Sequence, residues 1–516
     1  MKKGAITVYL SLTLLVLLSF ILAVIEGARV NAMQVKVECA ADLAYDSALA
    51  EYHRELLEQY GLFFIDTAYG MSSGSVDLTA DHIETYIKKN IDPLQEREND
   101  AVAKLAKKVT KDFYKLDVAK VSMEQASFAT DHKGEVFREQ AIDYMKNVYG
   151  IQVLEKLAGE IIGKNSAANS TGYTEGTDQD DAPEDTLENE LDQASQNLVE
   201  TFEEEKARLI KEAKEAGKEP EEIQEIEEVN IEDYNLANKI DRVKNSMIIQ
   251  IAMKGNTSSI SCKQFGGNFV SKRSNRNKGN MEMDKDPLWE EAVDKVIFGE
   301  YILEKGGYYG SGQTHKGLDY GAEYVIAGKN SDKENLTSVL HRIFVIRGIT
   351  NIACFSQDSF RNNLVKVIAY AIASLLRMPK IGDALAVVLK LAWIYFETVV
   401  ELQDIMAGGS VVIFKSPSDW RTSLSDGLGL SDNGGSASNG MDYQDFIRFF
   451  LIFKSNEKQA FRMMDLVEME IRQTPGNEYF RMDCCMDAFL AISYFTSEYG
   501  YDFKCTRKRY YNTGVN

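Results

Sequence analysis

The first apolar segment of the chain is long enough to cross a membrane. Residues 5–25 form an uncharged run that follows Lys2 and Lys3, and Glu26 and Arg29 come shortly after it. At about 1.5 Å of rise per residue, a helix of this run matches the thickness of a bilayer's hydrocarbon core. Because positive charge before a span stays inside the cell, we expect a single-pass cell-membrane protein with a cytoplasmic N-terminus and an extracellular C-terminal domain.

Two kinds of processing are alternatives to a full-length chain. A secretory signal has a shorter apolar core of about 7–15 residues, although Val30-Asn31-Ala32 is a passable cleavage site for one. Cleavage between Gly4 and Ala5 is the other alternative, because Lys-Lys-Gly before a hydrophobic helix is typical of prepilin-type leaders. That second cut would leave the span in place.

The helical pattern continues beyond the apolar run. Between Ala28 and Tyr60 the chain contains no proline or glycine and is rich in alanine, leucine and glutamate, which predicts one continuous rod, half in lipid and half outside. Ser19, Ala23 and Gly27 lie four residues apart, the small-xxx-small spacing that lets membrane helices approach closely. We expect them to pack the span against another helix, although any span with small residues produces such a row by chance.

Short strands are predicted at two places. Residues 113–130 alternate apolar and polar positions and shift phase around Lys120, which predicts two short strands. Residues 488–510 predict a terminal hairpin that turns at 498–500. This end carries a basic patch at residues 507–509, which lies in solvent or docks on an acidic surface.

Two apolar runs near the C-terminal half predict a helical hairpin. Residues 364–376 and 384–400 are interrupted by lysine and glutamate, and a charge at mid-membrane is costly, so we expect buried helices rather than spans. Whether this hairpin touches the bilayer is left open.

The whole pattern predicts an α+β fold, mainly helical: an N-terminal transmembrane helix continuing into an extracellular helical rod, and a helical ectodomain with small antiparallel sheets and a C-terminal hairpin.

Charge and composition divide the chain into four expected parts. The net charge is −21, and the segment Asp178–Asp233 alone holds 22 acidic and five basic residues. We expect residues 1–27 to form the cytoplasmic cap and transmembrane helix, and 28–164 the rod helix and a first α+β unit. Residues 165–287 form an acidic, partly disordered and partly helical insertion with a linker, and 288–516 a second, mainly helical unit with the hairpin. The polyanionic segment argues against nucleic acid as a partner.

Six cysteines in 516 residues do not make a disulfide-rich scaffold. Cys505 with one of the vicinal Cys484 and Cys485 is a candidate disulfide that would close a short C-terminal hairpin. The alternative is that these are small buried residues kept reduced.

The sequence contains no HExxH, no GxSxG and no GxGxxG after a strand, and none of its five histidines has another histidine or cysteine at metal spacing. We therefore expect no enzyme, no catalytic residues, no cofactor and no metal site. A site assembled from scattered aspartates and glutamates remains open.

Three stretches resemble known sequences. GAITVY at residues 4–9, followed by a span and EGAR at 26–29, resembles the tight-adherence pseudopilins of the TadE/TadG type. Residues 40–66 and 318–344 look like a family of uncharacterised single-span membrane proteins of Gram-positive bacteria. The resemblance implies a cell-surface location and membership of a pilus locus, with no established activity. Tyr9 stands where type IV pilins carry glutamate, which argues against incorporation as a major subunit.

These observations predict a membrane-anchored cell-surface structural or assembly protein, pseudopilin-like, that acts through protein–protein contacts. Its expected partners are the membrane, other envelope or pilus-type proteins, and a second copy bound through the N-terminal helix. The alternative is a membrane-tethered extracellular binding or signalling module that does not polymerise.

Overall fold

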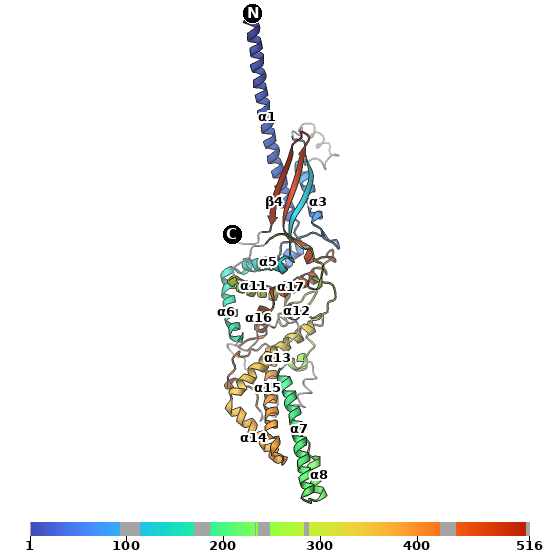
Figure 1. The fold of residues 1–516 in the computed structure, drawn as a ribbon, viewed down its shortest axis with the longest axis vertical. Coiled ribbons are helices and arrows are strands. Elements are labelled where there is room, and N and C mark those ends of the chain that lie inside the picture. The colour runs from blue at the N-terminus through green and yellow to red at the C-terminus, as the bar shows by residue number, and fades with distance from the viewer. Residues whose placement is uncertain are drawn as a thin grey trace. The chain divides into compact units, whose positions relative to one another are not determined.

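The computed structural model describes residues 2–92, 114–169, 186–232, 234–235, 248–282, 288–423 and 440–511. Helices account for 64% of the described residues, and a small antiparallel sheet includes the C-terminal strands (Figure 1). The mainly helical α+β fold predicted from the sequence is confirmed. Part of the polar stretch expected to be a linker, residues 170–185, lies outside the described residues.

The chain divides into two compact units, and each is assembled from separate segments. The first contains Met1–Tyr149, Asn268–Pro287 and Val467–Asn516, and the second contains Gly150–Gly267 and Leu288–Leu466. The four consecutive parts expected from the sequence stay a prediction about where independently folding parts begin and end.

The first unit combines one long helix with the sheet and several shorter helices. Its elements are α1 (Lys2–Leu49), α2 (Arg54–Tyr60), β1 (Ile65–Asp66), α3 (Val76–Ile91), β2 (Leu116–Phe128), α5 (Asp131–Tyr149), the short 3-10 helices η3 (Val270–Lys272) and η7 (Met482–Cys484), β3 (Cys485–Ser497) and β4 (Asp502–Tyr510).

The second unit is helical in its described parts. Its elements are α6 (Ile151–Asn169), α7 (Thr186–Glu215), α8 (Pro220–Glu228), α10 (Ile248–Ala252), α11 (Leu288–Gly306), α12 (Gly321–Ala327), α13 (Asp332–Gln357), α14 (Ser359–Leu375), η4 (Pro379–Ile381), α15 (Gly382–Met406), η5 (Pro417–Asp419), α16 (Tyr443–Phe453) and the first part of α17 (Asn456–Ile471).

Strand β3 is the centre of the sheet, because β1, β2 and β4 all pair with it in antiparallel fashion. The prediction of two short strands at residues 113–130 is wrong, since β2 is one strand of 13 residues. The phase shift around Lys120 marks a register irregularity between Val118 and Lys120. An extra residue in a bulge shifts the alternation of side chains without ending the strand, which explains the pattern. The predicted C-terminal hairpin is β3–β4.

Helix α1 is shorter than the continuous rod that the composition of residues 28–60 predicts. Helix α1 ends at Leu49, and a separate helix α2 begins at Arg54. His53 caps α2, since its Nδ1 accepts a hydrogen bond from the Leu56 amide at 3.4 Å. The His53 amide donates to the Phe64 carbonyl at 2.8 Å, and Tyr52 forms a bridge to Ile65. The chain therefore leaves the helix to pair with residues 64–65, which composition alone does not reveal.

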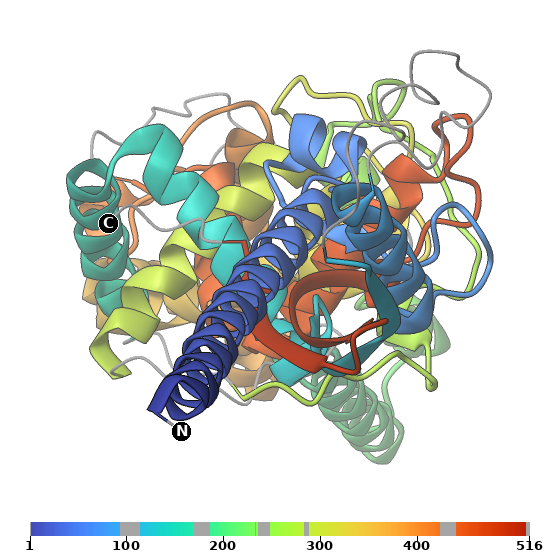
Figure 2. The same ribbon diagram turned by 90° about the horizontal axis from the view of Figure 1, so that it is seen from above.

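The second half of α1 lies in the core of the first unit. One face of it is fully or almost fully buried, against α3 and the inner face of the sheet, and Figure 2 shows α1 in dark blue beside the red strands. The buried residues of this face are Met33, Val37, Ala40, Ala41, Ala44, Tyr45 and Ala48. Four of these seven are alanines, and their short side chains let the helix lie close to the sheet.

Helix α13 is the second helix of the described chain that is long and apolar enough to cross a membrane, but 72% of its most apolar window is buried within the protein. It packs against α15, so it is a core helix of the second unit.

The apolar runs 364–376 and 384–400 fall in α14 and α15, which pack against each other and are joined through η4, as the predicted hairpin requires.

Candidate functional site

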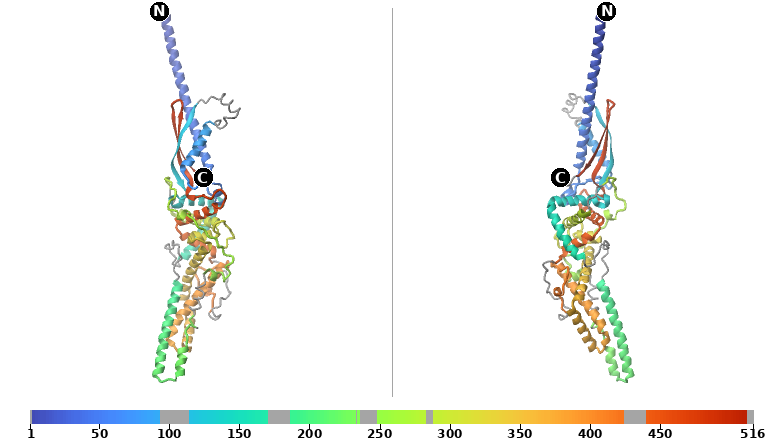
Figure 3. Two further views of the ribbon diagram at one scale, coloured as in Figure 1. Left: turned by 90° about the vertical axis from the view of Figure 1, so that its right-hand side faces the viewer. Right: turned by 60° about the vertical axis from the view of Figure 1, so that its left-hand side comes forward.

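The first half of α1 presents apolar side chains without a partner among the described residues. Between Ile6 and Ile25 every large hydrophobic side chain is 52–70% exposed. Both views of Figure 3 show this part of α1 projecting beyond the strands of the first unit. Exposed apolar surface of this extent is unfavourable in water and marks a contact with lipid or with other apolar helices. Helices of this kind occur both as membrane spans and as signal sequences.

The residues predicted to pack the span lie in this free part of α1. Ser19, Ala23 and Gly27 are all exposed, and a Cβ added to Gly27 would meet no atom within 4 Å. Ser19 Oγ donates to the Leu15 carbonyl within the helix at 2.8 Å, so it needs no other partner. Gly4 and Ala5, the candidate processing site, lie in the first turns of α1.

The tip of the β3–β4 hairpin contacts α1 directly after the apolar run ends. Tyr501 Oη donates to Glu26 Oε1 at 2.8 Å, and Glu26 is also ion-paired with Arg29. The Arg29 guanidinium lies 4.0 Å from the ring centroid of Tyr499. We call these four residues, Glu26, Arg29, Tyr499 and Tyr501, the collar. It joins positions 475 residues apart in sequence, so no local pattern could have predicted it.

Further tyrosine and lysine side chains lie near the collar. Ser497 Oγ donates to the Tyr114 carbonyl at 2.9 Å, Lys36 Nζ lies 5.4 Å from the Tyr114 ring centroid, and Lys115 is ion-paired with Glu498. Tyrosine and basic residues gather at the level of lipid headgroups in membrane proteins. The composition of this region is thus the one expected next to the end of a membrane span.

The basic patch at the C-terminal end docks on α1 of the same chain. Arg507 Nε lies 3.1 Å from Asp42 Oδ1, and Arg509 contacts Asp42 and Asp46 at 2.9 and 2.8 Å. Exposed pairs of this kind each stabilise a fold by less than about 1 kcal/mol, but here they form a network along one helix face. Of the two interpretations of this patch, docking on an acidic surface is the one that the structure supports.

Beneath this network, Tyr45 fixes α1 to the central strand. Its hydroxyl lies 2.6 Å from Ser493 Oγ, and its ring packs edge-on against Phe489 with centroids 6.1 Å apart. Burial is the main cause that raises the pKa of Tyr45 to about 12, so the hydroxyl keeps its proton. The second half of α1 is therefore held by polar bonds as well as by apolar packing.

The candidate disulfide is not formed. Cys484, Cys485 and Cys505 are free, buried thiols, and Cys505 lies opposite Ser493, eight residues along β3 from Cys485. At about 3.3 Å per residue this is roughly 26 Å, whereas a disulfide needs Cα atoms about 5.5 Å apart. The error came from assuming a short hairpin, because both strands are longer than the spacing suggested. Burial raises the pKa of the Cys484 thiol to about 11, and it also raises the pKa of Cys505.

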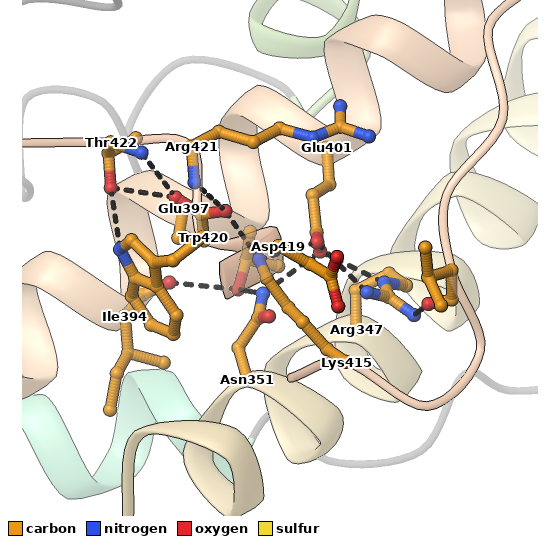
Figure 4. Close-up of polar contacts among 12 residues, drawn as sticks. Arg347, Asn351, Ile394, Glu397, Glu401, Lys415, Asp419, Trp420, Arg421 and Thr422 are labelled. Carbon is orange, nitrogen blue, oxygen red and sulfur yellow. Dashed lines mark hydrogen bonds and ion pairs between the residues drawn. The ribbon is translucent and has the colours of Figure 1, made fainter. Parts of the chain in front are cut away.

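In the second unit, four charged side chains gather in the interior: Arg347 of α13, Glu397 and Glu401 of α15, and Lys415 of the segment after α15 (Figure 4). We call them the buried charge cluster, because each is at most 2% exposed. Arg347 binds Glu401 with two parallel hydrogen bonds of 2.9 Å. Lys415 Nζ contacts Glu397 Oε1 and lies 2.8 Å from Glu401 Oε1.

Asn351 and the two basic residues surround Glu401. Asn351 Nδ2 donates to Glu401 Oε2 at 3.0 Å. Burial alone would raise the pKa of Glu401, but Arg347 and Lys415 hold it at about 2. Glu401 is therefore ionised in the resting structure at physiological pH.

Backbone amides and a hydroxyl converge on Glu397. The Arg421 amide donates to Oε1 at 3.0 Å, and the Thr422 amide and Oγ1 donate to Oε2 at 2.8 and 2.7 Å (Figure 4). The indole N–H groups of Trp393 and Trp420 both donate to Thr422 Oγ1, at 2.9 and 3.1 Å. In the sequence Glu397 stands out only because it interrupts an apolar run. This interruption was the one feature from which its buried polar contacts could have been predicted.

A further carboxyl group is buried apart from this cluster. Glu323 of α12 is 0% exposed, and its Oε1 accepts hydrogen bonds from the Tyr309 amide and the Tyr443 hydroxyl, both at 2.8 Å. Burial is the main cause that raises the pKa of Glu323 to about 7. Within the described parts of the chain, no group of three or more histidine, cysteine, aspartate and glutamate side chains is arranged to hold a metal ion.

Comparison with known proteins gives one match. A family model described as a family of unknown function (DUF5702) matches residues 225–497, just over half of the chain. This range contains the buried charge cluster and Glu323, and it begins after α1. No curated protein and no solved structure matches the chain.

Proposed function

Because the chain belongs to DUF5702, a family of unknown function, we propose its function from its own geometry: it is a membrane-anchored, pseudopilin-like structural or assembly protein of the cell surface. The span is residues 5–25, the N-terminus is cytoplasmic, and everything that follows the span in both units is extracellular. The protein acts by protein–protein contacts, first through a second copy of α1 and then through other envelope or pilus-type proteins.

The division of α1 into two halves carries this proposal. Its first half is exposed and apolar, whereas its second half is buried against the sheet, and the collar lies between them. A helix that is continuous through this boundary transmits the position of the span rigidly to the folded first unit. Neighbouring copies whose spans pack together would therefore also have their first units in register, which is what a structural assembly requires.

Retention of α1 is favoured over removal by signal peptidase. The passable cleavage site at Val30-Asn31-Ala32 lies in the middle of α1, and the next residue, Met33, is 0% exposed in the core. Cleavage there would also remove Glu26 and Arg29, the helix side of the collar. Removal of this segment would break contacts that the folded first unit makes with it, which argues against cleavage at this position.

Two features support the pseudopilin-like reading within this proposal. The resemblance of residues 4–9 and 26–29 to TadE/TadG-type sequences falls on the exposed half of α1 and on the collar that follows it, and Ser19, Ala23 and Gly27 are exposed as a surface for a second helix. Tyr9 is 70% exposed and offers no carboxylate to a neighbouring N-terminus, so we propose an accessory rather than a major subunit.

Topology is tested with the native thiols. Cys39 and Cys262 are exposed, whereas the other four cysteines are buried, so Cys262→Ser leaves Cys39 as the one reactive thiol. A membrane-impermeant maleimide should label Cys39 on intact cells. The control is the Lys3→Cys variant in a Cys39→Ser, Cys262→Ser background, which should be labelled only after permeabilisation when the chain is full-length and not at all when it is cut at Gly4. Protection of Cys39 in intact cells, or recovery of the protein in the medium without α1, would overturn the anchor.

Lateral association is tested by filling the small-residue face. Ser19→Leu should weaken self-association in membranes by about 1 kcal/mol, or roughly fivefold, measured by amine crosslinking of the full-length protein. Ser11→Leu is the matched control, because Ser11 also bonds to its own helix but lies about 120° around the axis from Ala23, the centre of the face. An anchored protein that stays monomeric in both forms would instead favour the tethered binding or signalling module.

A further inference from the structure

The buried charge cluster is an expensive feature for a protein interior. The side chain of Lys415 is 1% exposed and that of Glu397 is 0% exposed, so each charged group loses its hydration. Removing such ions from water costs several kcal/mol per charge, and their mutual attraction often fails to offset it. An arrangement of this cost calls for an explanation beyond stability alone.

We propose that Lys415 and Glu397 condense to form an intramolecular amide crosslink between the two side chains. The ammonium of Lys415 and the carboxylate of Glu397 become an Nζ–Cδ amide and one water molecule. Of the three protons on Nζ, one stays on the amide nitrogen and two leave with the Glu397 oxygen. The reaction needs no oxidant, cofactor or external co-reactant.

The nucleophile and its first proton acceptor are already in contact. Lys415 Nζ donates to Glu397 Oε1, so a proton that moves along this bond produces a neutral amine and a neutral carboxylic acid. The carboxylic acid is also a better electrophile than a carboxylate.

The electrophile has donors on the oxygen that develops charge. When Nζ attacks Cδ, Oε1 becomes the leaving oxygen and Oε2 the oxyanion. The Thr422 amide and Oγ1 point at Oε2 from 2.8 and 2.7 Å. Two fixed donors at this distance are the arrangement that stabilises a tetrahedral intermediate.

The second proton has an acceptor on the other side of the amine. Attack leaves a positive charge on Nζ, which makes its remaining protons more acidic than those of a free lysine, and the ionised Glu401 Oε1 lies 2.8 Å from it. Glu401 can take this proton and pass it to the leaving oxygen. Its paired bonds to Arg347 and its bond to Asn351 keep it in place during the transfer.

Water is kept away from the cluster by aromatic side chains. Trp420 lies beneath the Lys415 amine, 4.6 Å from it to the ring centroid, and Trp393 and Phe355 pack edge-on against Trp420. Condensation releases water, so a dry site shifts the equilibrium toward the amide. The product also has two fewer buried charges, with Glu401 and Arg347 left as a balanced pair.

The crosslink would tie the segment after α15 to α15 itself, across residues 397–415. None of the six cysteines forms a disulfide in the structure. An amide crosslink would therefore supply a covalent brace that is independent of redox conditions. This inference does not depend on the proposed function, because it concerns the interior of the second unit.

Peptide mapping of the full-length protein tests it directly. Trypsin cuts after Lys390 and, if Lys415 is free, after Lys415, so unlinked protein gives peptide 391–415. A linked Lys415 resists trypsin, and the expected product is peptide 391–421 with a mass about 18 Da below that of its sequence. Cyanogen bromide cleaves this peptide after Met406, between the two residues, and the linked halves should remain one species.

Each other outcome would overturn the proposal. Peptide 391–415 at its sequence mass would show that no crosslink forms, and halves that separate after Met406 would show a dehydration elsewhere. Lys415→Arg keeps the positive charge but cannot condense, so it should restore cleavage after residue 415. Glu401→Gln should lower the linked fraction at least about tenfold if Glu401 is the proton acceptor. Full crosslinking in Glu401→Gln would refute that role.

Discussion

Replacing Glu323 with glutamine should remove a specific pH dependence from the stability of the second unit. The carboxyl group is 0% exposed, and burial raises its pKa from 4.5 to about 7. The folded state therefore binds this proton more tightly than the unfolded state does. Its contribution to stability is fully present below about pH 4.5 and is lost as the pH rises towards 7 and above.

The size of the effect follows from the shift in pKa. One pKa unit corresponds to about 1.4 kcal/mol, and linkage over the whole shift gives a loss of about 2–3 kcal/mol between pH 5 and pH 8. Glutamine has nearly the same shape and can accept the same hydrogen bonds from the Tyr309 amide and the Tyr443 hydroxyl. We therefore expect Glu323→Gln to be more stable than the wild type at pH 8 and close to it at pH 5.

Tryptophan fluorescence is a suitable assay, because Trp289, Trp393 and Trp420 all belong to the second unit. Urea unfolding of the full chain in detergent, at pH 5 and pH 8, gives the free energy of unfolding of that unit in each variant. Glu334→Gln is the control, since Glu334 is exposed and should leave the pH dependence unchanged. The reasoning would be refuted if the free energy of unfolding fell by the same amount between pH 5 and pH 8 in the wild type and in Glu323→Gln.

Three further substitutions test the packing of the two units. Arg347→Met removes the two parallel hydrogen bonds to Glu401 and should lower the free energy of unfolding of the second unit by about 3–5 kcal/mol. The same fluorescence assay measures this loss, and a loss below about 1 kcal/mol would contradict the geometry. Tyr45→Phe removes the bond to Ser493 and should destabilise the first unit by about 1 kcal/mol, seen as faster hydrogen exchange of β3 amides while the second unit is unchanged. Gly321→Ala would place a Cβ 2.3 Å from the Gly306 carbonyl oxygen and should lower the free energy of unfolding of the second unit by more than about 2 kcal/mol. Gly299→Ala is the control, because its Cβ would meet no atom nearer than 3.9 Å and should cause no measurable loss of stability.

Local patterns were sufficient for the elements whose signal lies within a few neighbouring residues. The apolar run, the terminal hairpin and the α14–α15 pair were all predicted from periodicity and turn residues. The two short strands at residues 113–130 were wrong only because a bulge and a strand break produce the same change of phase. The rod was predicted too long, because the bridge from Tyr52 to Ile65 depends on a segment beyond the helix.

The sites depend on contacts that no local pattern contains. Glu26 and Tyr501 meet only because the hairpin lies along α1, and the candidate disulfide failed for the same reason, since strand register decides which residues face each other. Glu397 was visible as a charge inside an apolar helix, but its partner Lys415 lies in the segment after α15, which shows no helical or strand pattern of its own. A charged residue within an otherwise buried helix is therefore worth following as a sign of an interior partner.

The fate of α1 in the mature protein tests the central claim most directly. The measurement is the intact mass and N-terminal sequence of the protein extracted from membranes, combined with protease shaving of whole cells. The account predicts a chain that keeps residues 5–32, either full-length or shortened only at Gly4, and an ectodomain that protease removes from intact cells. A mature N-terminus at Met33, with the protein released from the membrane, would contradict it.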